Sequence, residues 1–412
     1  MSRARQLKRT MQPNWPHSLC DWKPKLSGHP KARMQVIDMF SGCGGMSLGF
    51  ASVGSRNKMF KLVGALDINE TSLATYQRNF GVPAILGDIR CLAKSPPALN
   101  NFLGSLKGYS ESCPTVLIGC APCQGFTAHR KKNWDSPDPR NSLVGAFAQV
   151  AVRMMPDLVV MENVPELLSG RYWPYFEGFR KIMERAGYTV KAAIHNAAEF
   201  GTPQERFRAL VVASRKINCL MPKPTLLRKD FVTVRDAIGE LPPVKAGQVS
   251  VIDPYHRSAK HKESTLRVIQ AVPPNGGSRP SGIGPACLSK IKGFYDVYGR
   301  LAWDKPAITI THYARNPASG RFVHPEQNRG LTMREAARLQ GFPDAFEFLG
   351  GFDDIFRQIG EAVAPPFAAA VADSISQSFF NPDSIEDCEA LVLAPVRDSF
   401  AGVIAGIKSR AR

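Results

Sequence analysis

The stretch that decides the fold is Met34-Gln-Val-Ile-Asp-Met-Phe-Ser-Gly-Cys-Gly-Gly45. Its first half is a short apolar run typical of a buried β-strand, and its second half is a glycine-rich turn into a helical segment. Small residues at such a turn let backbone amides approach a ligand closely, and a helix N-terminus favours an anionic group. The spacing differs from the GxGxxG dinucleotide fingerprint. A purely structural turn is the alternative interpretation.

The same alternation of apolar runs and helical stretches continues outward from this segment. Predicted strands cover residues 34–40, 61–67, 115–119, 157–161, 189–195 and 208–214. One predicted helix follows the strand at 61–67 and ends near Phe80, and four others cover residues 140–155, 173–186, 332–340 and 366–379. Strands separated by helices imply βαβ units, so the sequence predicts an α/β fold with a mostly parallel sheet covered on both faces. Such sheets bind ligands at the C-terminal ends of their strands.

Acidic residues occur at two of these strand ends. Asp67 ends the second strand, where an acid accepts hydrogen bonds from ribose hydroxyls in nucleotide-binding folds. A role at the N-terminus of the next helix is the alternative, because Asn69 and Thr71 follow. Asp88 ends a third segment, and a turn residue is an equally good interpretation of it.

The segment Gly119-Cys-Ala-Pro-Cys-Gln-Gly-Phe126 places Cys123 just past a buried strand, on a loop shaped by proline and glycine. A nucleophilic thiolate needs an exposed, rigid mount and a lowered pKa, and this position offers the mount. Cys120 and Cys123 also form a CxxC pair. A zinc or redox role is disfavoured, because no second CxxC or spaced His pair completes a metal site.

Two further segments carry charged side chains at strand ends. Glu162-Asn-Val164 ends the strand that begins at Asp157, where a buried carboxyl group can act as an acid. Gln204-Glu-Arg-Phe-Arg208 lies at the start of the strand predicted at 208–214. The alternation of side chains predicts that the guanidinium groups of Arg206 and Arg208 lie on one face, suited to oxygens of a base or phosphate. An edge strand with solvated arginines is the alternative.

The net charge of +18 is concentrated in two segments of the 412-residue chain. Residues 1–33 carry a net +7 and residues 216–330 a net +10, which leaves +1 for the rest. This distribution predicts a surface that faces a polyanion, with a solubilising surface as the alternative. Residues 1–33 read as a flexible or loosely packed basic arm, and a transit peptide is a weaker interpretation of them.

The pattern along the chain predicts five parts. They are the arm 1–33, the first part of the α/β domain 34–215, a smaller loop-rich and strand-rich domain 216–330, a return to the α/β domain 331–380, and a tail 381–412. Apolar runs are too short to span a bilayer, and the N-terminus lacks the apolar core of a signal peptide. The nine scattered cysteines indicate reduced thiols. We therefore expect a protein that is not secreted and has no membrane partner.

Taken together and in order, these motifs resemble the DNA (cytosine-5) methyltransferases of bacterial and phage modification systems. The matching blocks are Asp-x-Phe-x-Gly-x-Gly-Gly, Pro-Cys-Gln, Glu-Asn-Val and Gln-x-Arg-x-Arg. Arg334-Glu-Ala-Ala-Arg-Leu-Gln-Gly-Phe-Pro343 and Gln358-Ile-Gly-Glu-Ala-Val-Ala-Pro-Pro366 look like the last two blocks of the family. The resemblance covers residues 34–380, and it implies a Rossmann-like S-adenosylmethionine-dependent methyltransferase domain with a target-recognition domain at 216–330.

The resemblance implies a role for each matching residue. Cys123 would be the nucleophile, Glu162 would contact N3 and the amine of the target cytosine, Arg208 would contact O2, and Arg206 would support the loop or a phosphate. Substrate-binding residues would be Gln124, Asn163 and Gln204. The S-adenosylmethionine pocket would contain Asp38, Phe40, Ser41, Gly42, Gly44, Gly45, Asp67, Ile68, Asp88, Ile89, Pro122, Glu361 and Val363, and no metal would be needed.

The chain departs from the family pattern at two positions. The last block usually reads Gly-Asn-x-Val, and Glu361 stands here in place of the asparagine. Ile68 occupies a position that is sometimes aromatic, so the second face of the adenine would be held by aliphatic contact.

The resemblance implies methyl transfer to carbon 5 of a flipped-out cytosine in double-stranded DNA, through a covalent bond between Cys123 and carbon 6, with S-adenosylhomocysteine as the second product. The expected enzyme is a cytoplasmic, nucleoid-associated monomer, with a cognate restriction endonuclease as a possible partner at the same site. Two alternatives remain open in the sequence. One branch of the family methylates tRNA, and a regulatory DNA-binding module could retain the fold, although such modules tend to lose the nucleophile.

Overall fold

The computed structural model describes residues 19, 22–122, 142–216, 218–285, 296–380 and 391–396. The chain divides into two compact units. Unit 1 comprises Met1–Lys23, Ala197–Arg206 and Thr225–Pro366, and unit 2 comprises Pro24–Asn196, Phe207–Pro224 and Phe367–Arg412. Cys123 and Gln124 lie outside the described residues. The five-part division expected from the sequence remains a prediction.

Unit 2 is built on a seven-stranded sheet with the strand order β3-β2-β1-β4-β5-β7-β6. The strands are β1 (Met34–Met39), β2 (Phe60–Asp67), β3 (Ala84–Leu86), β4 (Thr115–Gly119), β5 (Leu158–Asn163), β6 (Thr189–Asn196) and β7 (Phe207–Ser214). β1 to β5 are parallel, whereas β7 pairs antiparallel with both β5 and β6. The α/β fold with a mostly parallel sheet, expected from the sequence, is confirmed.

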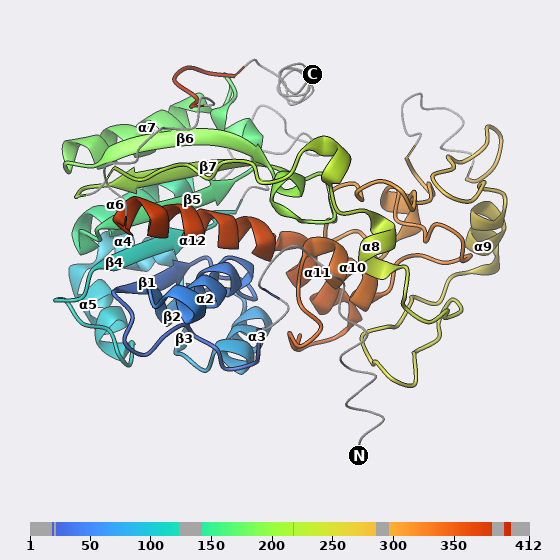
Figure 1. Ribbon diagram of the computed structural model, residues 1–412, viewed down its shortest axis with the longest axis horizontal. Helices are drawn as coiled ribbons and strands as arrows, with labels where there is room; N and C mark the ends of the chain where they lie inside the picture. The colour runs from blue at the N-terminus through green and yellow to red at the C-terminus, as the bar shows by residue number, and fades with distance from the viewer. Residues whose placement is uncertain are drawn as a thin grey trace. The chain divides into compact units, whose positions relative to one another are not determined.

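Helices cover both faces of this sheet (Figure 1). They are α2 (Gly45–Asn57), α3 (Glu70–Phe80), α4 (Ile89–Lys94), α5 (Pro96–Ser105), α6 (Ser142–Met154), α7 (Trp173–Arg185), a 3₁₀ turn η3 (Pro165–Leu168) and α12 (Pro365–Phe380), which belongs to unit 2 from Phe367 on. α2 and α12 touch at Gly49, where a Cβ atom would lie 2.4 Å from the backbone nitrogen of Ala369. On the other face, Leu92, Phe147 and Phe179 from α4, α6 and α7 share one buried core with the sheet.

The parallel strands fix where a ligand can bind in unit 2. β1, β2, β4 and β5 run in one direction, so their C-terminal ends lie at the same edge of the sheet. Asp38, Asp67 and Glu162 occupy those ends, and the residues after Gly119 leave the sheet at the same edge. The order of strands therefore gathers side chains that are far apart in the sequence.

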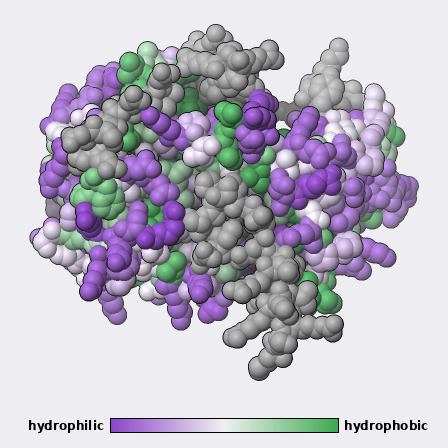
Figure 2. Space-filling model, in the orientation of Figure 1, coloured by the Kyte–Doolittle hydropathy of each residue, from purple (hydrophilic) through white to green (hydrophobic). Residues whose placement is uncertain are grey.

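Unit 1 contains short helices joined by long irregular segments. Its elements are η4 (Ala197–Phe200), η5 (Arg228–Asp230), α8 (Val234–Ile238), α9 (Glu263–Gln270), η7 (Pro317–Ser319), α10 (Met333–Gln340) and α11 (Phe352–Glu361). A capping box begins α10: the Thr332 hydroxyl accepts from the Glu335 amide at 3.1 Å, and the Glu335 carboxylate accepts from the Thr332 amide at 2.8 Å. Hydrophilic residues dominate the visible surface around α9 (Figure 2).

The expected richness in strands is wrong for the described part of residues 216–330. Backbone pairing occurs there only as isolated bridges, such as Val249 with Arg257 and Arg300 with Val323. The physical reason is local, because prolines and glycines recur too often for a ladder of hydrogen bonds to continue. Buried arginines replace the ladders: the Arg300 guanidinium donates to the carbonyls of Val272, Ile269, His324 and Gln327 at 2.9–3.1 Å.

The basic arm differs from expectation in its second half. The Leu62 amide donates to the Ser27 carbonyl at 2.7 Å, and the His29 amide donates to the Phe60 carbonyl at 3.1 Å, so residues 24–33 pack against β2. Trp22 is buried in unit 1, with its ring 5.4 Å from that of Phe346. An aromatic side chain that finds an apolar partner stabilises a segment whose composition alone indicates a loose tail.

Candidate active site

Asp38 lies at the end of β1 and is 1% exposed. Its Oδ2 accepts a hydrogen bond from the Ser47 hydroxyl at 2.6 Å, and that hydroxyl lies 2.9 Å from the Tyr76 hydroxyl. Oδ1 has no hydrogen-bond partner among the described residues. Burial raises the pKa of Asp38 to about 8, because an isolated carboxylate is poorly solvated there. The site thus holds a buried carboxyl oxygen without a partner in the described part of the chain, on a group whose raised pKa favours the protonated form at neutral pH.

The glycine-rich turn after β1 is shaped as the sequence predicts. Phe40 has a φ of 59°, which is a strained conformation for a non-glycine residue, and its ring lies 6.1 Å from that of Phe147. Gly44 has a φ of 96°, and a Cβ atom there would lie 2.3 Å from the Phe80 ring. Gly42 is different, since a Cβ atom there would meet nothing within 4 Å. Open space beside Gly42 allows a ligand to approach the backbone.

Ser41 and Gly45 complete this turn. The Ser41 amide donates to the Leu66 carbonyl at 3.2 Å, and its carbonyl accepts from the Gly44 amide at 2.9 Å. Gly45 is the first residue of α2 and is buried. The turn is therefore tied to both β2 and α2, which gives the ligand-facing backbone a fixed position.

Asp67 connects the end of β2 to the glycine-rich turn. Its Oδ2 accepts from the Gly42 amide and its Oδ1 from the Asn69 amide, both at 2.8 Å. Burial raises its pKa, and these amides lower it less. Asp67 is not the N-cap residue of the next helix, because Asn69 caps α3 by accepting from the Ser72 amide. Ile68, which follows Asp67, is 73% exposed, so an aliphatic side chain lies open beside the carboxylate.

Asp88 and Ile89 have structural partners. Asp88 caps α4 by accepting from the Arg90 amide at 2.8 Å, and hydrogen bonding to the Arg90 side chain lowers the pKa of its carboxyl group. The Ile89 side chain is 2% exposed and belongs to the core beneath the sheet. The turn interpretation of Asp88 therefore describes its local structure, and only the backbone of Ile89 could contact a ligand.

The loop after β4 leads toward Cys123. The Cys120 amide donates to the Met39 carbonyl at 3.3 Å, and the Ala121 carbonyl accepts from the Asn163 side-chain amide at 3.1 Å. The Asn163 oxygen accepts from the Val164 amide, and the residue is 1% exposed. Asn163 thus ties the end of β5 to the start of this loop, which makes it a positioning residue. Pro122 is half-buried beside it.

Glu162 and Arg208 form the charged pair of the site. Nε of Arg208 lies 2.8 Å from Oε1 of Glu162, while the two side chains are 13% and 9% exposed. The geometry satisfies an ion pair and not a hydrogen bond, because Oε1 has no aligned donor among the described residues. Arg208 also donates to the Phe207 carbonyl at 2.6 Å. The pair arises because β5 and β7 are neighbours in the sheet.

Arg206 and Gln204 are anchored within unit 1. Arg206 is 3% exposed and donates to the carbonyls of Ile310, Gly360 and Ala362 at 2.9–3.1 Å. The expectation of two guanidinium groups on one strand face is wrong, because β7 begins only at Phe207.

Gln204 is fully buried. Its amide nitrogen donates to the Leu339 carbonyl at 2.9 Å, and its oxygen accepts from the Ile310 amide at 2.9 Å. This arrangement makes Gln204 a positioning residue and gives no support to the predicted contact with the substrate.

The last two predicted cofactor residues also belong to unit 1. Glu361 is exposed and ends α11, and Val363 is 5% exposed. The turn between them is held because the Gln340 side-chain amide donates to the Ala362 carbonyl at 2.6 Å. At Gly360 a Cβ atom would lie 2.1 Å from the backbone nitrogen of His312, so only glycine permits this close approach. Contact of Glu361 or Val363 with a cofactor remains a prediction.

Sequence reasoning missed two side chains near the site. Ser47 donates to Asp38, and the Tyr76 hydroxyl lies beside that of Ser47. The position of Ser47 in the first turn of α2, two residues after Gly45, is the signal that could have identified it. The Cys120 thiol lies 3.5 Å from the Met46 sulfur, and burial, with Glu162 and Asp38 nearby, raises its pKa well above the usual range, so this thiol stays protonated.

The described residues contain no group of three or more His, Cys, Asp or Glu side chains placed to hold a metal ion. None of their helices combines the length and apolar character that a membrane span requires.

Comparison with known proteins agrees with this geometry. The family description "C-5 cytosine-specific DNA methylase" matches residues 34–377. The Type II methylase M.HgiDII of Herpetosiphon aurantiacus is 32% identical over 351 residues, which cover 83% of this chain and 95% of the relative. The Type II methyltransferase M1.HphI of Haemophilus parahaemolyticus is 36% identical over 343 residues, which cover 83% and 86%.

Solved structures share the fold at lower identity. A DNA modification methyltransferase encoded within an Escherichia coli prophage has a TM-score of 0.64 at 22% identity, over 84% of this chain and 100% of that one. The Dnmt2 methyltransferase of S. pombe has a TM-score of 0.53 at 20% identity, over 85% and 100%. With the family match spanning almost the whole of the described α/β fold and its site, the chain belongs to the C-5 cytosine-specific DNA methylases and is a DNA (cytosine-5) methyltransferase.

Proposed function

We propose that this enzyme transfers a methyl group from S-adenosylmethionine to carbon 5 of a flipped-out cytosine in a specific double-stranded DNA site, through a covalent bond between Cys123 and carbon 6. The observation that carries the proposal is the Glu162–Arg208 pair at the sheet edge, with Asn163 tying this edge to the loop that leads to Cys123. A buried carboxyl beside a guanidinium group matches the N3, amine and O2 edge of cytosine. Duplex DNA follows from the family, since a stacked base must leave the helix to reach such a site.

The residues around the glycine-rich turn fit S-adenosylmethionine. Open space beside Gly42, the Asp67 carboxylate and the exposed Ile68 side chain offer a backbone approach, a hydroxyl acceptor and an aliphatic surface for a nucleoside. The unpartnered Oδ1 of Asp38 offers a buried carboxyl oxygen that can form a hydrogen bond with a ligand. Phe40, Ser41, Gly44, Gly45, Asp88, Ile89 and Pro122 complete the proposed pocket. When bound, this cofactor supplies an electrophilic methyl group on a sulfonium centre.

The chain's own residues then act on the cytosine. The Cys123 thiolate adds to carbon 6 while Glu162 donates a proton or hydrogen bond at N3, so carbon 5 gains the electron pair of an enamine. Carbon 5 takes the methyl group, a base removes its proton, and the electrons of that C–H bond expel the Cys123 thiolate. Arg208 holds O2 in place through these steps, while Arg206 and Gln204 keep the preceding backbone rigid.

Trapping on a duplex library that contains 5-fluorocytosine tests this proposal, with S-adenosylmethionine present and Cys123→Ser as the comparison. Fluorine cannot leave as a proton does, so wild type should stall as a denaturation-resistant adduct, whereas Cys123→Ser should form none. Sequencing the trapped DNA also yields the target site. Adducts on tRNA but not on DNA would show that RNA is the substrate. The absence of adducts on both would overturn the assignment of Cys123 as the nucleophile.

Four further features remain proposals. We infer that the enzyme works as a monomer and shares its target with a cognate restriction endonuclease, because the relatives named above are Type II modification enzymes. We infer a cytoplasmic, nucleoid-associated location from the same kinship and from the net charge of +18. Residues 216–330 are proposed to recognise the target. Analytical ultracentrifugation with and without the trapped duplex tests the monomer.

A further inference from the structure

An irregular hairpin projects from unit 1 at residues 247–259. Its two arms are joined by hydrogen bonds from the Gly247 amide to the Ala259 carbonyl at 3.0 Å and from the Ser250 amide to the His256 carbonyl at 3.0 Å. Residues 251–255 form the tip, which is closed by a bond from the His256 amide to the Asp253 carbonyl at 3.0 Å. We call this element the 247–259 hairpin.

The return arm of the 247–259 hairpin is fixed to the start of α10. The Arg334 side chain reaches Asp253 at 2.5 Å, and the Arg334 amide donates to the Tyr255 carbonyl at 2.9 Å. The His256 ring bonds to the Thr332 hydroxyl at 3.0 Å. The Tyr255 hydroxyl donates to the Phe348 carbonyl at 2.8 Å. The hairpin is therefore a rigid mount, since its tip is held by an ion pair and several hydrogen bonds.

This rigid mount presents apolar side chains to solvent. Val249 is 48% exposed, Ile252 is 59% exposed and Val251 is 101% exposed. Clustered aliphatic side chains on a rigid element indicate a contact surface, because their exposure to water is unfavourable unless a partner covers them. Scattered single residues would need no such explanation.

The surroundings of the tip carry unpaired positive charge. Residues 241–262 contain Lys245, Arg257, Lys260 and Lys262 against one acid, Asp253, which Arg334 neutralises. Neither Arg257 nor Lys260 has an ion-pair partner among the described residues. Cations that are left without partners next to an apolar tip favour an anionic partner with apolar surfaces.

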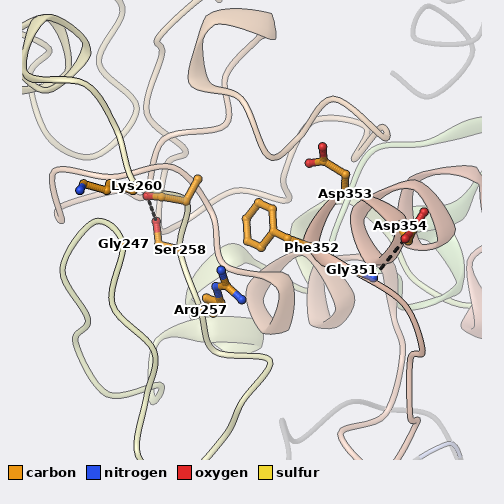
Figure 3. A pocket seen from close by; sticks show the side chains of 9 residues that line it. Gly247, Arg257, Ser258, Lys260, Gly351, Phe352, Asp353 and Asp354 are labelled. Atoms are coloured by element: carbon orange, nitrogen blue, oxygen red, sulfur yellow. Dashed lines mark hydrogen bonds between the residues drawn. The ribbon is translucent and has the colours of Figure 1, made fainter.

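Arg257 and Lys260 also line a pocket of about 500 Å³ at the base of the hairpin (Figure 3). The Arg257 guanidinium lies 5.6 Å from the centre of the Phe352 ring. The two carboxylates of the pocket are neutralised within unit 1, because Asp353 pairs with Arg315 and Asp354 with Arg357, each at 2.7 Å. The pocket thus keeps a positive character and is large enough for a phosphate group.

We propose that the 247–259 hairpin is a DNA-contacting element in which Val251 and Ile252 pack on bases while Arg257 and Lys260 hold neighbouring phosphates. This inference rests on the proposed function and names the element that meets the duplex. Nucleic acids combine a dense row of anions with base surfaces, and DNA adds the apolar thymine methyl groups that suit Val251 and Ile252. Proteins that deform DNA use apolar side chains flanked by cations in this way. A protein partner is disfavoured, because lysine is depleted at such interfaces.

The two halves of the hairpin should have different salt signatures. The double variant Arg257→Gln/Lys260→Gln should weaken binding of an ordinary duplex that carries the target sequence identified by trapping. The slope of log affinity against log salt should fall by about 1.8, since each lost phosphate contact removes about 0.9. Val251→Ser with Ile252→Ser should weaken binding about 10-fold at every salt concentration with the slope unchanged, because apolar contacts release no counterions. All four side chains are at the surface, so melting temperatures should match that of wild type.

Matched controls lie elsewhere on the surface. Leu393→Ser removes an aliphatic side chain that is 80% exposed and lies outside residues 216–330, and Lys107→Gln removes an exposed cation from unit 2. Both should bind the duplex as wild type does. If the hairpin variants also bind as wild type does, with the same salt slope, the inference is overturned.

Photocrosslinking supplies a direct readout. A benzophenone amino acid in place of Val251 should crosslink to the target duplex, while the same group in place of Leu393 should not. A crosslink from position 251 to a second protein copy, with none to DNA, would overturn the inference. The proposed function fails separately, through loss of the 5-fluorocytosine adduct in wild type, so the two failures are distinguishable.

Discussion

At the scale of single residues, the buried carboxyl groups of Glu162 and Asp38 differ in the side chains that surround them. Both are acids at strand ends, 7% and 1% exposed. Glu162 lies against Arg208, whereas Asp38 has only neutral hydroxyl partners. Burial therefore raises the pKa of Asp38, because an isolated carboxylate is poorly solvated there.

Replacing Glu162 with glutamine should slow methyl transfer by about 100-fold or more in single-turnover assays, because an amide cannot protonate N3 as a carboxyl group does. Binding of S-adenosylmethionine, followed by calorimetry, should be unchanged. Glu177→Gln on the surface of α7 is the matched control and should leave the rate intact. A Glu162→Gln enzyme with the wild-type rate would contradict the proposed role.

Asp38 should make the stability of the protein depend on pH. Its pKa is about 8 in the folded state and near 3.8 when unfolded, so the folded state holds a proton that the unfolded state loses between these values. Stability is therefore greatest below pH 3.8 for this group and falls as pH rises toward 8. Asp38→Asn mimics the protonated form, and its melting temperature relative to wild type should rise from pH 5 to pH 8. A constant difference over that range would refute the assignment.

At the scale of elements, α10 is the support on which the irregular part of unit 1 is built. Its eight residues are all buried, and its Glu335 carboxylate pairs with Arg329 at 2.7 Å. The Arg329 charge lowers the pKa of Glu335 to about 2 despite burial. A short helix can be a stable support in this way, because its cap and its ion pair are shielded from water.

Thr332→Ala should lower stability by about 1–2 kcal/mol, because the hydroxyl both caps α10 and bonds to the His256 ring. Chemical denaturation would measure the loss. Thr332→Ser keeps the hydroxyl and should retain most of the stability. If Thr332→Ser lost as much as Thr332→Ala, the missing methyl group rather than the cap would be the cause.

At the scale of the whole molecule, positive charge is the dominant feature. A net charge of +18 and a pI near 9.6 favour binding to any polyanion, whatever its nucleotide sequence. Non-specific binding of DNA is driven by the release of counterions, so it depends strongly on salt. Specific recognition must therefore be measured as a ratio of affinities rather than as one constant.

Raising the salt concentration from about 50 to 200 mM should weaken binding of an unrelated duplex by about 10³-fold or more if six to ten phosphates are contacted. Fluorescence anisotropy over a salt series would measure the slope. Binding of S-adenosylmethionine in the same series serves as the control and should change far less. A shallow slope for DNA would mean that the basic segments face solvent and act only in solubility.

The sequence by itself determined the α/β fold, the positions of six of the seven strands of the sheet to within two residues, and the family motifs, whereas the short strand β3 was not predicted. This was possible because strand periodicity, glycine turns and capping boxes are local signals that depend on neighbours in the chain. The residues 34–45 needed no distant partner to be read as a strand, a turn and a helix start.

Only the tertiary structure decided how distant residues pair. The Glu162–Arg208 pair depends on β7 lying antiparallel beside β5, and the roles of Arg206 and Gln204 depend on carbonyls more than 100 residues away. In the described part of residues 216–330, prolines and glycines interrupt the expected strands, and buried arginines from distant positions satisfy backbone carbonyls there instead. Local patterns specify backbone conformation, whereas burial and side-chain partners are set by the packing of the whole chain.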